Sequence, residues 1–94
     1  METRDKGMDL VSVIIPTYNR AHLLPDAIAS VKQQNHRPIE LIIVDDGSTD
    51  HTRQLVRSHR PDNRPGAGFM LHYLRQENRG APAARNRGLK RSRG

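Results

Sequence analysis

The stretch from Ile39 to Asp50, IELIIVDDGSTD, decides the fold predicted for this chain. Its first half is an apolar run rich in β-branched residues, which is typical of a strand buried on both faces, as in a parallel sheet. Gly47 permits a tight reversal, and the polar residues after it can cap a helix. We therefore expect Asp45 and Asp46 at the carboxyl end of a buried strand, where open α/β sheets bind their ligands.

Strands and helices alternate along the rest of the chain. The predicted strands are 10–15, 39–45 and 69–74, and the predicted helices are about 23–31, 50–59 and 81–89. Pro16 is expected to end the first strand, and Asn19 is expected to cap the first helix. Ala84 and Gly88, four residues apart, permit the last helix to pack closely on a sheet. This βαβαβα order favours a three-layer α/β fold with a parallel sheet.

The composition limits the function classes. The chain has 94 residues and no cysteine, so it holds at most one small domain, and neither a disulfide framework nor a thiolate metal site is expected. It contains no apolar run long enough to span a membrane and no recognisable signal peptide. We therefore expect a location in the cytoplasm, or at the periphery of the inner membrane face.

Positive charge gathers in the last third of the chain. Residues 63–94 carry eight Lys or Arg and one acid, Glu77, whereas residues 1–62 carry eight Lys or Arg and nine acids. One interpretation is a non-catalytic module that binds nucleic acid or anionic surfaces through residues 63–94. This segment lacks the interleaved aromatic residues that help to bind nucleic acid. The other interpretation is a solvated helix face followed by a frayed tail.

Four groups of polar residues follow the predicted strands. They are residues 16–19, Asp45 with Asp46, residues 78–80, and Arg85 with Asn86. Because the carboxyl ends of parallel strands meet at one edge of a sheet, these groups would share a crevice that could hold a ring, a ribose and a diphosphate.

Each of these groups also has a simpler interpretation. Tyr18 offers a flat face for a base, or it is a half-buried tyrosine on the rim of the sheet. Asp46 could accept from a uracil N3–H or a ribose hydroxyl, or, like Asp45, it caps a turn. Arg79 and Arg85 could hold a diphosphate together with backbone amides at a helix start, or they belong to a solvated basic face.

Several other kinds of site are excluded by pattern. No GxGxxG follows the first strand, and no GxxxxGK[ST] occurs, which excludes a dinucleotide fingerprint and a P-loop. The histidines lack the spacing of metal ligands, and no Ser/His/Asp set is apparent.

Three motifs carry a resemblance to a known family: VSVIIPTYNR at 11–20, IIVDDGSTD at 42–50, and N-x-G-x-x-x-A-R-N-x-G at 78–88. In this order and spacing the chain resembles family 2 glycosyltransferases with the GT-A fold. The resemblance implies a Rossmann-like parallel sheet with strand order 3-2-1, and inverting transfer of a sugar from a nucleotide-sugar, often a UDP-sugar. It also implies a glycan, lipid or protein acceptor, a role in cell-envelope polysaccharide biosynthesis, and no nucleic-acid partner.

The resemblance also assigns site residues. By motif position, the nucleotide-sugar site would consist of Pro16, Thr17, Tyr18, Asp45, Asp46, Arg85 and Asn86. Tyr18 would lie against the base, and Asp46 would bind the base or the ribose with Asp45 beside it.

The chain departs from the family pattern in one respect. The metal-binding D-x-D motif and the acidic catalytic base of the family are not found in these 94 residues, so no catalytic residue is expected here. The resemblance implies Mg²⁺ or Mn²⁺ for the full-length enzyme. We therefore expect residues 10–94 to be the truncated nucleotide-binding part of a domain, inactive alone, after a flexible leader at 1–9. The strand at 10–15 would then expose an edge through which copies of the chain could associate.

Overall fold

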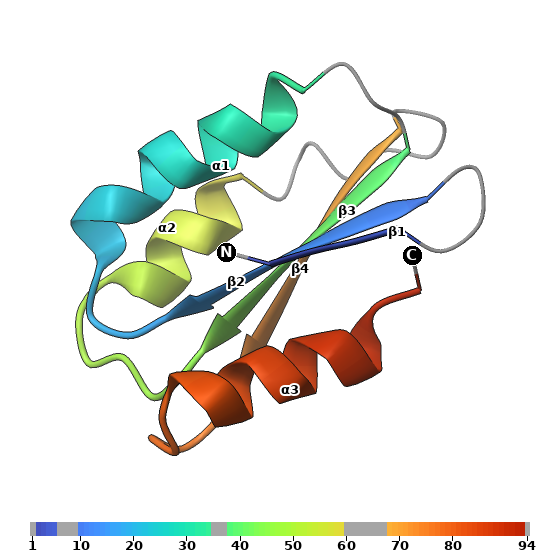
Figure 1. Cartoon of the computed structure of the whole chain (residues 1–94). Coiled ribbons are helices and arrows are strands. Elements are labelled where there is room, and N and C mark those ends of the chain that lie inside the picture. The colour runs from blue at the N-terminus through green and yellow to red at the C-terminus, as the bar shows by residue number, and fades with distance from the viewer. Residues whose placement is uncertain (1, 6–9, 35–37, 60–67, 94) are drawn as a thin grey trace.

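The computed structural model describes residues 2–5, 10–34, 38–59 and 68–93, the first of these by their backbone alone. A four-stranded sheet runs through the centre of the molecule in the order β1-β2-β3-β4 (Figure 1). The strands are β1 (Glu2–Asp5), β2 (Val11–Thr17), β3 (Ile39–Asp45) and β4 (Phe69–Arg75). β2, β3 and β4 pair in parallel, whereas β1 pairs with β2 antiparallel. The predicted order 3-2-1 of the three parallel strands is confirmed.

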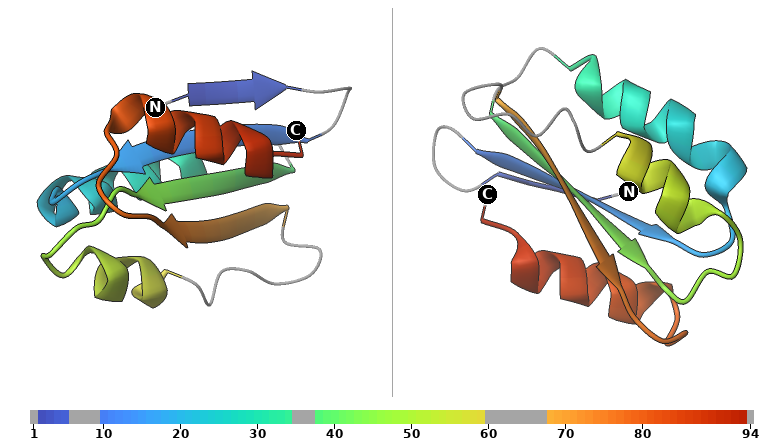
Figure 2. Two further views of the ribbon diagram at one scale, coloured as in Figure 1. Left: turned by 90° about the horizontal axis from the view of Figure 1, so that it is seen from below. Right: turned by 180° about the vertical axis from the view of Figure 1, so that it is seen from behind.

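Helices cover both faces of this sheet. They are the short 3₁₀ helix η1 (Ala21–Leu23), α1 (Leu24–Lys32), α2 (Thr52–Ser58) and α3 (Ala81–Arg91). The two views of Figure 2 show α1 and α2 on one face and α3 on the other. The predicted three-layer α/β architecture is therefore confirmed. None of the helices that the structure describes has the length and apolarity needed to cross a bilayer.

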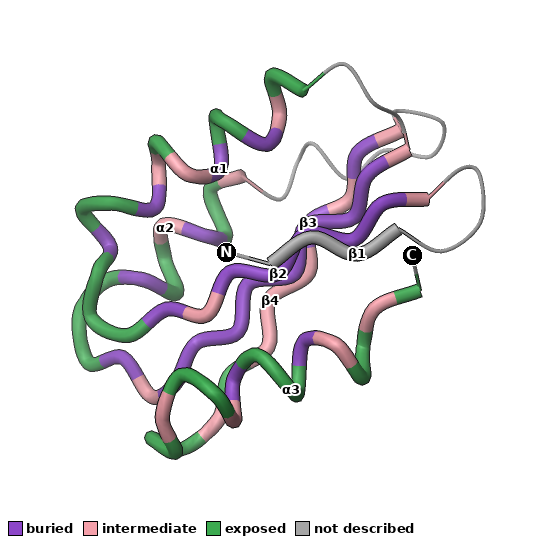
Figure 3. The backbone as a smooth tube through the Cα atoms, viewed as in Figure 1, coloured by how far each residue is buried: buried purple, intermediate pink, exposed green. Residues whose placement is uncertain are grey.

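Alternation along the strands divides the core into two clusters. The cluster beneath α1 and α2 takes the odd-numbered strand positions, and the cluster beneath α3 takes the even-numbered ones. Their strand members are Val11, Val13, Ile15, Ile39, Leu41, Ile43, Phe69 and Leu71 in the first, and Ile14, Ile42 and Val44 in the second. Because both faces are covered, β2 and β3 are buried along almost their whole length (Figure 3).

Helix α3 approaches the sheet most closely at Gly88. A Cβ atom there would lie 2.4 Å from Cγ2 of Ile14 and 3.3 Å from Cγ2 of Val44. Ala84, one turn earlier on the same side of the helix, is fully buried. The predicted close packing through small residues is confirmed, since any side chain at Gly88 would have to displace the helix or the core.

The amino-terminal segment differs from the predicted flexible leader. Glu2–Asp5 forms β1, which pairs with β2 in the register Glu2↔Ile14 to Asp5↔Val11. The remaining leader residues, 1 and 6–9, lie outside the described residues. The prediction that the strand at 10–15 has an uncovered edge is therefore wrong, and the expected association of copies through that edge loses its basis.

Pro16 lies inside β2, although it was expected to end the strand. The amide of Asp46 donates to the carbonyl oxygen of Thr17 at 2.9 Å, so odd-numbered positions of β2 direct their polar backbone groups toward β3. Pro16 faces the other side, where the pairing with β1 reaches only to Ile14. The missing N–H of proline therefore removes no bond from the sheet as described.

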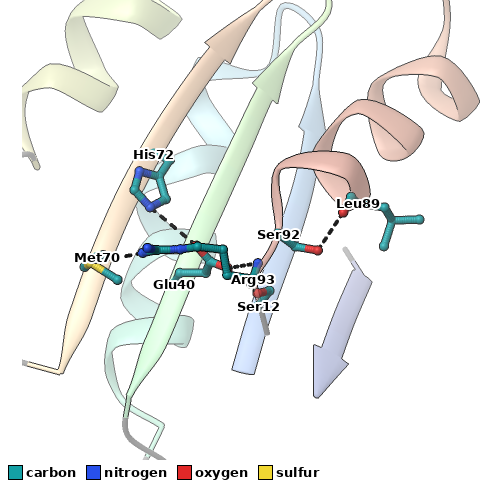
Figure 4. A network of polar contacts seen from close by, with 7 residues as sticks. All are labelled: Ser12, Glu40, Met70, His72, Leu89, Ser92 and Arg93. Atoms are coloured by element: carbon teal, nitrogen blue, oxygen red, sulfur yellow. Dashed lines mark hydrogen bonds and ion pairs between the residues drawn. The ribbon is translucent and has the colours of Figure 1, made fainter. Parts of the chain in front are cut away.

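Glu40, near the amino end of β3, is fully buried and joins four parts of the chain (Figure 4). Its carboxylate accepts a hydrogen bond from the Ser12 hydroxyl of β2 at 2.5 Å and from the Arg93 amide at 2.6 Å. Nε2 of His72 in β4 lies 3.5 Å from Oε1, and Nε of Arg93 lies 3.8 Å from it. The frayed tail of the second interpretation of the basic segment is therefore wrong as far as Arg93, and residue 94 lies outside the described residues.

These contacts explain how a carboxylate is accommodated in the interior. Burial raises the pKa of Glu40, but the Ser12 hydroxyl, the Arg93 amide and the charges of His72 and Arg93 outweigh burial and lower the pKa below its usual value. Glu40 is therefore ionised at neutral pH and holds the chain after α3 against the sheet.

Candidate functional site

A hollow of about 430 Å³ opens at the carboxyl end of the sheet, between the loop after β2 and the first turns of α3. It is lined by Pro16, Thr17, Tyr18, Arg20, Asp46, Ala81, Ala84 and Arg85. Tyr18, one of these lining residues, is 44% exposed. The volume lies within the range usual for small-molecule sites, about 300–1,000 Å³. The structure thus brings five predicted site residues together and adds Arg20.

Asn19 joins the loop after β2 to the loop after β3. Its Oδ1 accepts from the amides of Thr49 at 2.8 Å and Asp50 at 3.3 Å, and its own amide donates to Oγ of Ser48 at 2.8 Å. Its φ of 51° lies in the left-handed region, which asparagine tolerates better than most residues. The prediction that Asn19 caps the following helix is wrong. Its contacts hold the backbone on either side of it, including Tyr18.

Asp50 completes this junction from the loop after β3. Its Oδ2 accepts from the Ala21 amide at 3.2 Å, at the start of η1, and its Oδ1 accepts from the amide of Thr52 at 3.0 Å, at the start of α2. Burial raises the pKa of Asp50, but these bonds, a bond from the Thr52 hydroxyl and the charge of His51 outweigh burial and lower it. One carboxylate therefore binds the first amide of two helices and ties the loop after β3 to the residue that follows Arg20.

Asp46 uses both carboxylate oxygens to bind the loop between β4 and α3. Oδ1 accepts from the side-chain amide of Gln76 at 2.9 Å and from the Arg79 amide at 2.8 Å, and Oδ2 accepts from the Gly80 amide at 2.8 Å. The bond from Gln76, followed by the bond from the Arg79 amide, lowers the pKa of Asp46 although burial opposes the shift. Asp46 is therefore an ionised wall of the hollow that also shapes the entry to α3.

This arrangement changes how a diphosphate could be held. The sequence suggested that backbone amides at the start of α3 would contribute, but the amides of Arg79 and Gly80, directly before this helix, donate to Asp46. Arg79 is also not among the residues that line the hollow. The cations that do line it are Arg85, on the first turns of α3, and Arg20. Arg20 was not among the predicted site residues, although its place directly after the Tyr18 loop could have indicated it.

Asp45 and Asn86 lie outside the hollow. Asp45 occupies an odd position of β3 and therefore points toward α1 and α2, opposite to Asp46. Its Oδ1 accepts from the Ser48 amide at 2.8 Å, and its Oδ2 accepts from the Tyr73 hydroxyl at 2.5 Å. Asp45 thus caps the turn after β3, which was the simpler interpretation of its place in the sequence. Asn86 is exposed on α3 and does not line the hollow.

The described residues do not fit a divalent cation. No group of three or more His, Asp or Glu side chains gathers among them. Asp45 and Asp46 face opposite sides of the sheet, and their oxygens already accept protein hydrogen bonds. Mg²⁺ and Mn²⁺ need several oxygen ligands around one point. The metal expected for the full-length enzyme therefore has no binding set in the part of the chain that the structure describes.

Comparison with known proteins places this site in a family. The family model of glycosyl transferase family 2 matches residues 12–94, which include every residue that lines the hollow. The chain belongs to glycosyl transferase family 2. Solved structures agree: a Pyrobaculum calidifontis mannosyltransferase, PcManGT, in complex with GDP-Man and Mn²⁺, superposes with a TM-score of 0.71 at 30% identity. Staphylococcus aureus TarS superposes with a TM-score of 0.72 at 33% identity.

Curated relatives of the chain are named as glycosyltransferases. An uncharacterized glycosyltransferase of Rickettsia felis is 44% identical over 80 residues, which are 85% of this chain and 12% of that protein. Bacillus subtilis TuaG, named for teichuronic acid biosynthesis, is 44% identical over 86 residues, which are 90% of this chain and 32% of that protein. PcManGT and TarS are matched over 88% and 93% of this chain but only 24% and 15% of their own length. The chain therefore spans less than a third of each of these proteins.

Proposed function

We propose that the hollow at the carboxyl end of the sheet binds the nucleoside diphosphate of a nucleotide-sugar donor. The observation that carries this proposal is the grouping of Tyr18, Arg20 and Arg85 around one hollow in a family 2 domain. Aromatic side chains stack on bases, and guanidinium groups form paired hydrogen bonds with phosphate oxygens. The solved complex of PcManGT with GDP-Man supports this class of ligand.

Different lining residues would bind different parts of the nucleotide. Pro16, Thr17 and Tyr18 form the nucleoside side, and Arg20 and Arg85 balance the charge of the diphosphate. Asp46 accepts three N–H groups of the protein, and a carboxylate offers about four acceptor positions. It therefore keeps acceptor capacity for a base N–H or a ribose hydroxyl.

For the protein as a whole we propose inverting transfer from a UDP-sugar to a glycan, lipid or protein acceptor, on the cytoplasmic side of the membrane. The resemblance in the sequence supports this assignment. The likeness to TuaG, named for teichuronic acid biosynthesis, supports a role in cell-envelope polysaccharide synthesis.

Calorimetric titration of the 94-residue chain with UDP and with GDP tests the nucleotide site. We expect saturable binding that Tyr18→Ala and Arg85→Gln each weaken by about tenfold, the loss of one stacking contact or one charged hydrogen bond. Arg91→Gln removes the same charge as Arg85→Gln from an exposed position of α3 outside the hollow, and should leave the affinity within about twofold. Absence of saturable binding, or an equal loss in Arg91→Gln, would contradict the proposal.

We further propose that residues 1–94 alone do not turn over a donor. The sequence has no D-x-D motif, and no set of side chains fitted to a divalent cation lies among the described residues. Incubation of the chain with UDP-sugars, Mn²⁺ and candidate acceptors checks this proposal, and any sugar transfer would disprove it.

The alternative of a basic nucleic-acid module stays a prediction. Two of its cations have partners within the chain, because Arg87 donates to the Arg75 carbonyl at 2.7 Å and Arg93 lies beside Glu40. A random oligonucleotide titrated at two salt concentrations separates the two functions. Steeply salt-dependent binding that is lost when Arg85, Arg87 and Arg91 are replaced would favour the alternative.

A further inference from the structure

A second hollow, of about 310 Å³, lies on the α2 side of the sheet beside the outer strand β4. It is lined by Arg53, Val56, Arg57, Tyr73 and Arg75, none of which lines the nucleotide hollow. Val56 lines it although it is fully buried, the partly buried Tyr73 packs against the core cluster beneath α1 and α2, and the rest of the lining is arginine. It is therefore a separate concave site with its own lining.

The lining of this second hollow concentrates positive charge. Arg53 and Arg57 are four residues apart on α2, a spacing that brings like charges together and destabilises a helix. Both are exposed, and no ion pair joins either one to an acid among the described residues. No Asp or Glu is among the described residues that line this hollow. Three guanidinium groups thus line one hollow, and the one carboxylate bonded to its described lining is that of Asp45, which accepts from the Tyr73 hydroxyl.

Two further contacts hold lining side chains of the second hollow in place. Arg75 donates to the carbonyl oxygen of Ser48 at 3.0 Å, which anchors its guanidinium while leaving other N–H groups available. The Tyr73 hydroxyl donates to Asp45. Burial, that bond and the charge of Asp45 raise the pKa of Tyr73, while the charges of Arg75 and Arg53 act in the opposite direction, as expected for guanidinium groups close to the hydroxyl. The arginines of α2 and β4 therefore face the same small volume.

We propose that the second hollow binds the phosphate group of a small ligand. Guanidinium groups match the oxygens of a phosphate in pairs, and an anion would relieve the repulsion between Arg53 and Arg57. The volume lies at the lower end of ligand sites, about 300 Å³, which suits a phosphate with a small organic substituent. The phosphate can belong to a free ester or to a lipid headgroup that reaches into the hollow.

Nuclear magnetic resonance titration of the 15N-labelled 94-residue chain with inorganic phosphate tests this proposal. We expect saturable shifts of the amides of Arg53, Arg57 and Arg75. The double variant Arg53→Gln/Arg57→Gln should weaken the apparent affinity at least about tenfold, since two charged contacts are lost. The matched double variant Lys90→Gln/Arg91→Gln loses the same charge from exposed positions of α3 and should change the affinity by less than about twofold.

Sedimentation with vesicles separates the two sources of the phosphate. Binding to vesicles that contain phosphatidylglycerol, but not to pure phosphatidylcholine, with loss in the Arg53→Gln/Arg57→Gln variant, assigns the hollow to a lipid headgroup. Shifts by inorganic phosphate without vesicle binding assign it to a free ester. The proposal is overturned if neither probe binds, if both double variants lose affinity equally, or if the shifts centre on Tyr18 and Arg85 instead. Because the last outcome reports on the nucleotide hollow, the two sites are judged independently.

Discussion

The two ends of β3 use carboxylates in contrasting ways. At the amino end, Glu40 is fully buried, and its oxygens contact Ser12, His72 and Arg93. At the carboxyl end, Asp46 also binds its own chain, but it lines a hollow with an exposed aromatic ring and two arginines. At the amino end of β3 the protein encloses the carboxylate of Glu40, whereas at the carboxyl end the carboxylate of Asp46 borders a hollow.

This contrast shows that a bonded carboxylate does not by itself mark a binding site. Both carboxylates have a lowered pKa and both tie separate segments together. The carboxyl end differs because the carboxylate of Asp46 lines a hollow together with Tyr18, Arg20 and Arg85. Glu40 positions α3 from its far end, and Asp46 positions the first turn of α3 from the near end.

The largest effect is expected at the closed end. Glu40→Ala leaves the Ser12 hydroxyl and the Arg93 amide without their acceptor and should lower the free energy of unfolding by about 2–4 kcal/mol. Urea denaturation measures this loss, with Glu77→Ala as the control at an exposed position, where a change within about 0.5 kcal/mol is expected. A cost for Glu40→Ala no greater than for Glu77→Ala would show that the amino end does not depend on its carboxylate.

The next largest loss of stability is expected from a substitution in α3, the helix that Glu40 and Asp46 hold at its two ends. Gly88→Ala places a Cβ 2.4 Å from Cγ2 of Ile14 and should destabilise the fold by about 1–3 kcal/mol through overpacking. The control Lys90→Ala, exposed on the same helix, should stay within about 0.5 kcal/mol. Because the displaced helix carries Arg85, Gly88→Ala should also weaken UDP binding, and calorimetry checks this. Unchanged stability would mean that α3 does not rest on the sheet at Gly88.

Lowering the pH is expected to reduce the stability of the fold by a smaller amount, through both Glu40 and Asp46. Glu40 and Asp46 have folded pKa values below their usual values of 4.5 and 3.8, so the folded state favours the charged forms. The stability that they contribute is complete above these usual values and is lost as the pH falls through the lower folded values. Urea midpoints measured from about pH 7 to about pH 3 should fall in the native chain and fall less in Glu40→Gln. A native chain that is equally stable at about pH 3 would contradict the assignment.

The sequence predicted the parallel sheet because its strands and turns have strong local signals. The apolar run at 39–45 matches β3 residue for residue, since a strand buried on both faces leaves little freedom of interpretation. β1 was missed because all four side chains of Glu2–Asp5 are polar. This edge strand is held by backbone pairing, which leaves no pattern in the side chains.

Site residues were harder to predict than strands. Asp45 and Asp46 were expected to act side by side, although consecutive residues of a strand point to opposite faces. Applying that alternation would have assigned Asp46 to the α3 side and Asp45 to the other. The role of Glu40 was missed for a related reason: one acid within an apolar run requires buried partners. Those partners come from three distant segments, which local patterns cannot connect.

The most direct test of the nucleotide site compares the two ends of β3 in one experiment. Chemical shift changes are recorded on the 15N-labelled chain as UDP or GDP is added. The proposed site predicts saturable shifts of the amides of Tyr18, Arg20 and Arg85, while the amides of Ser12 and Arg93 at the Glu40 end stay unchanged. No shifts at saturating nucleotide, or equal shifts at both ends, would contradict the assignment of the hollow to the donor nucleotide.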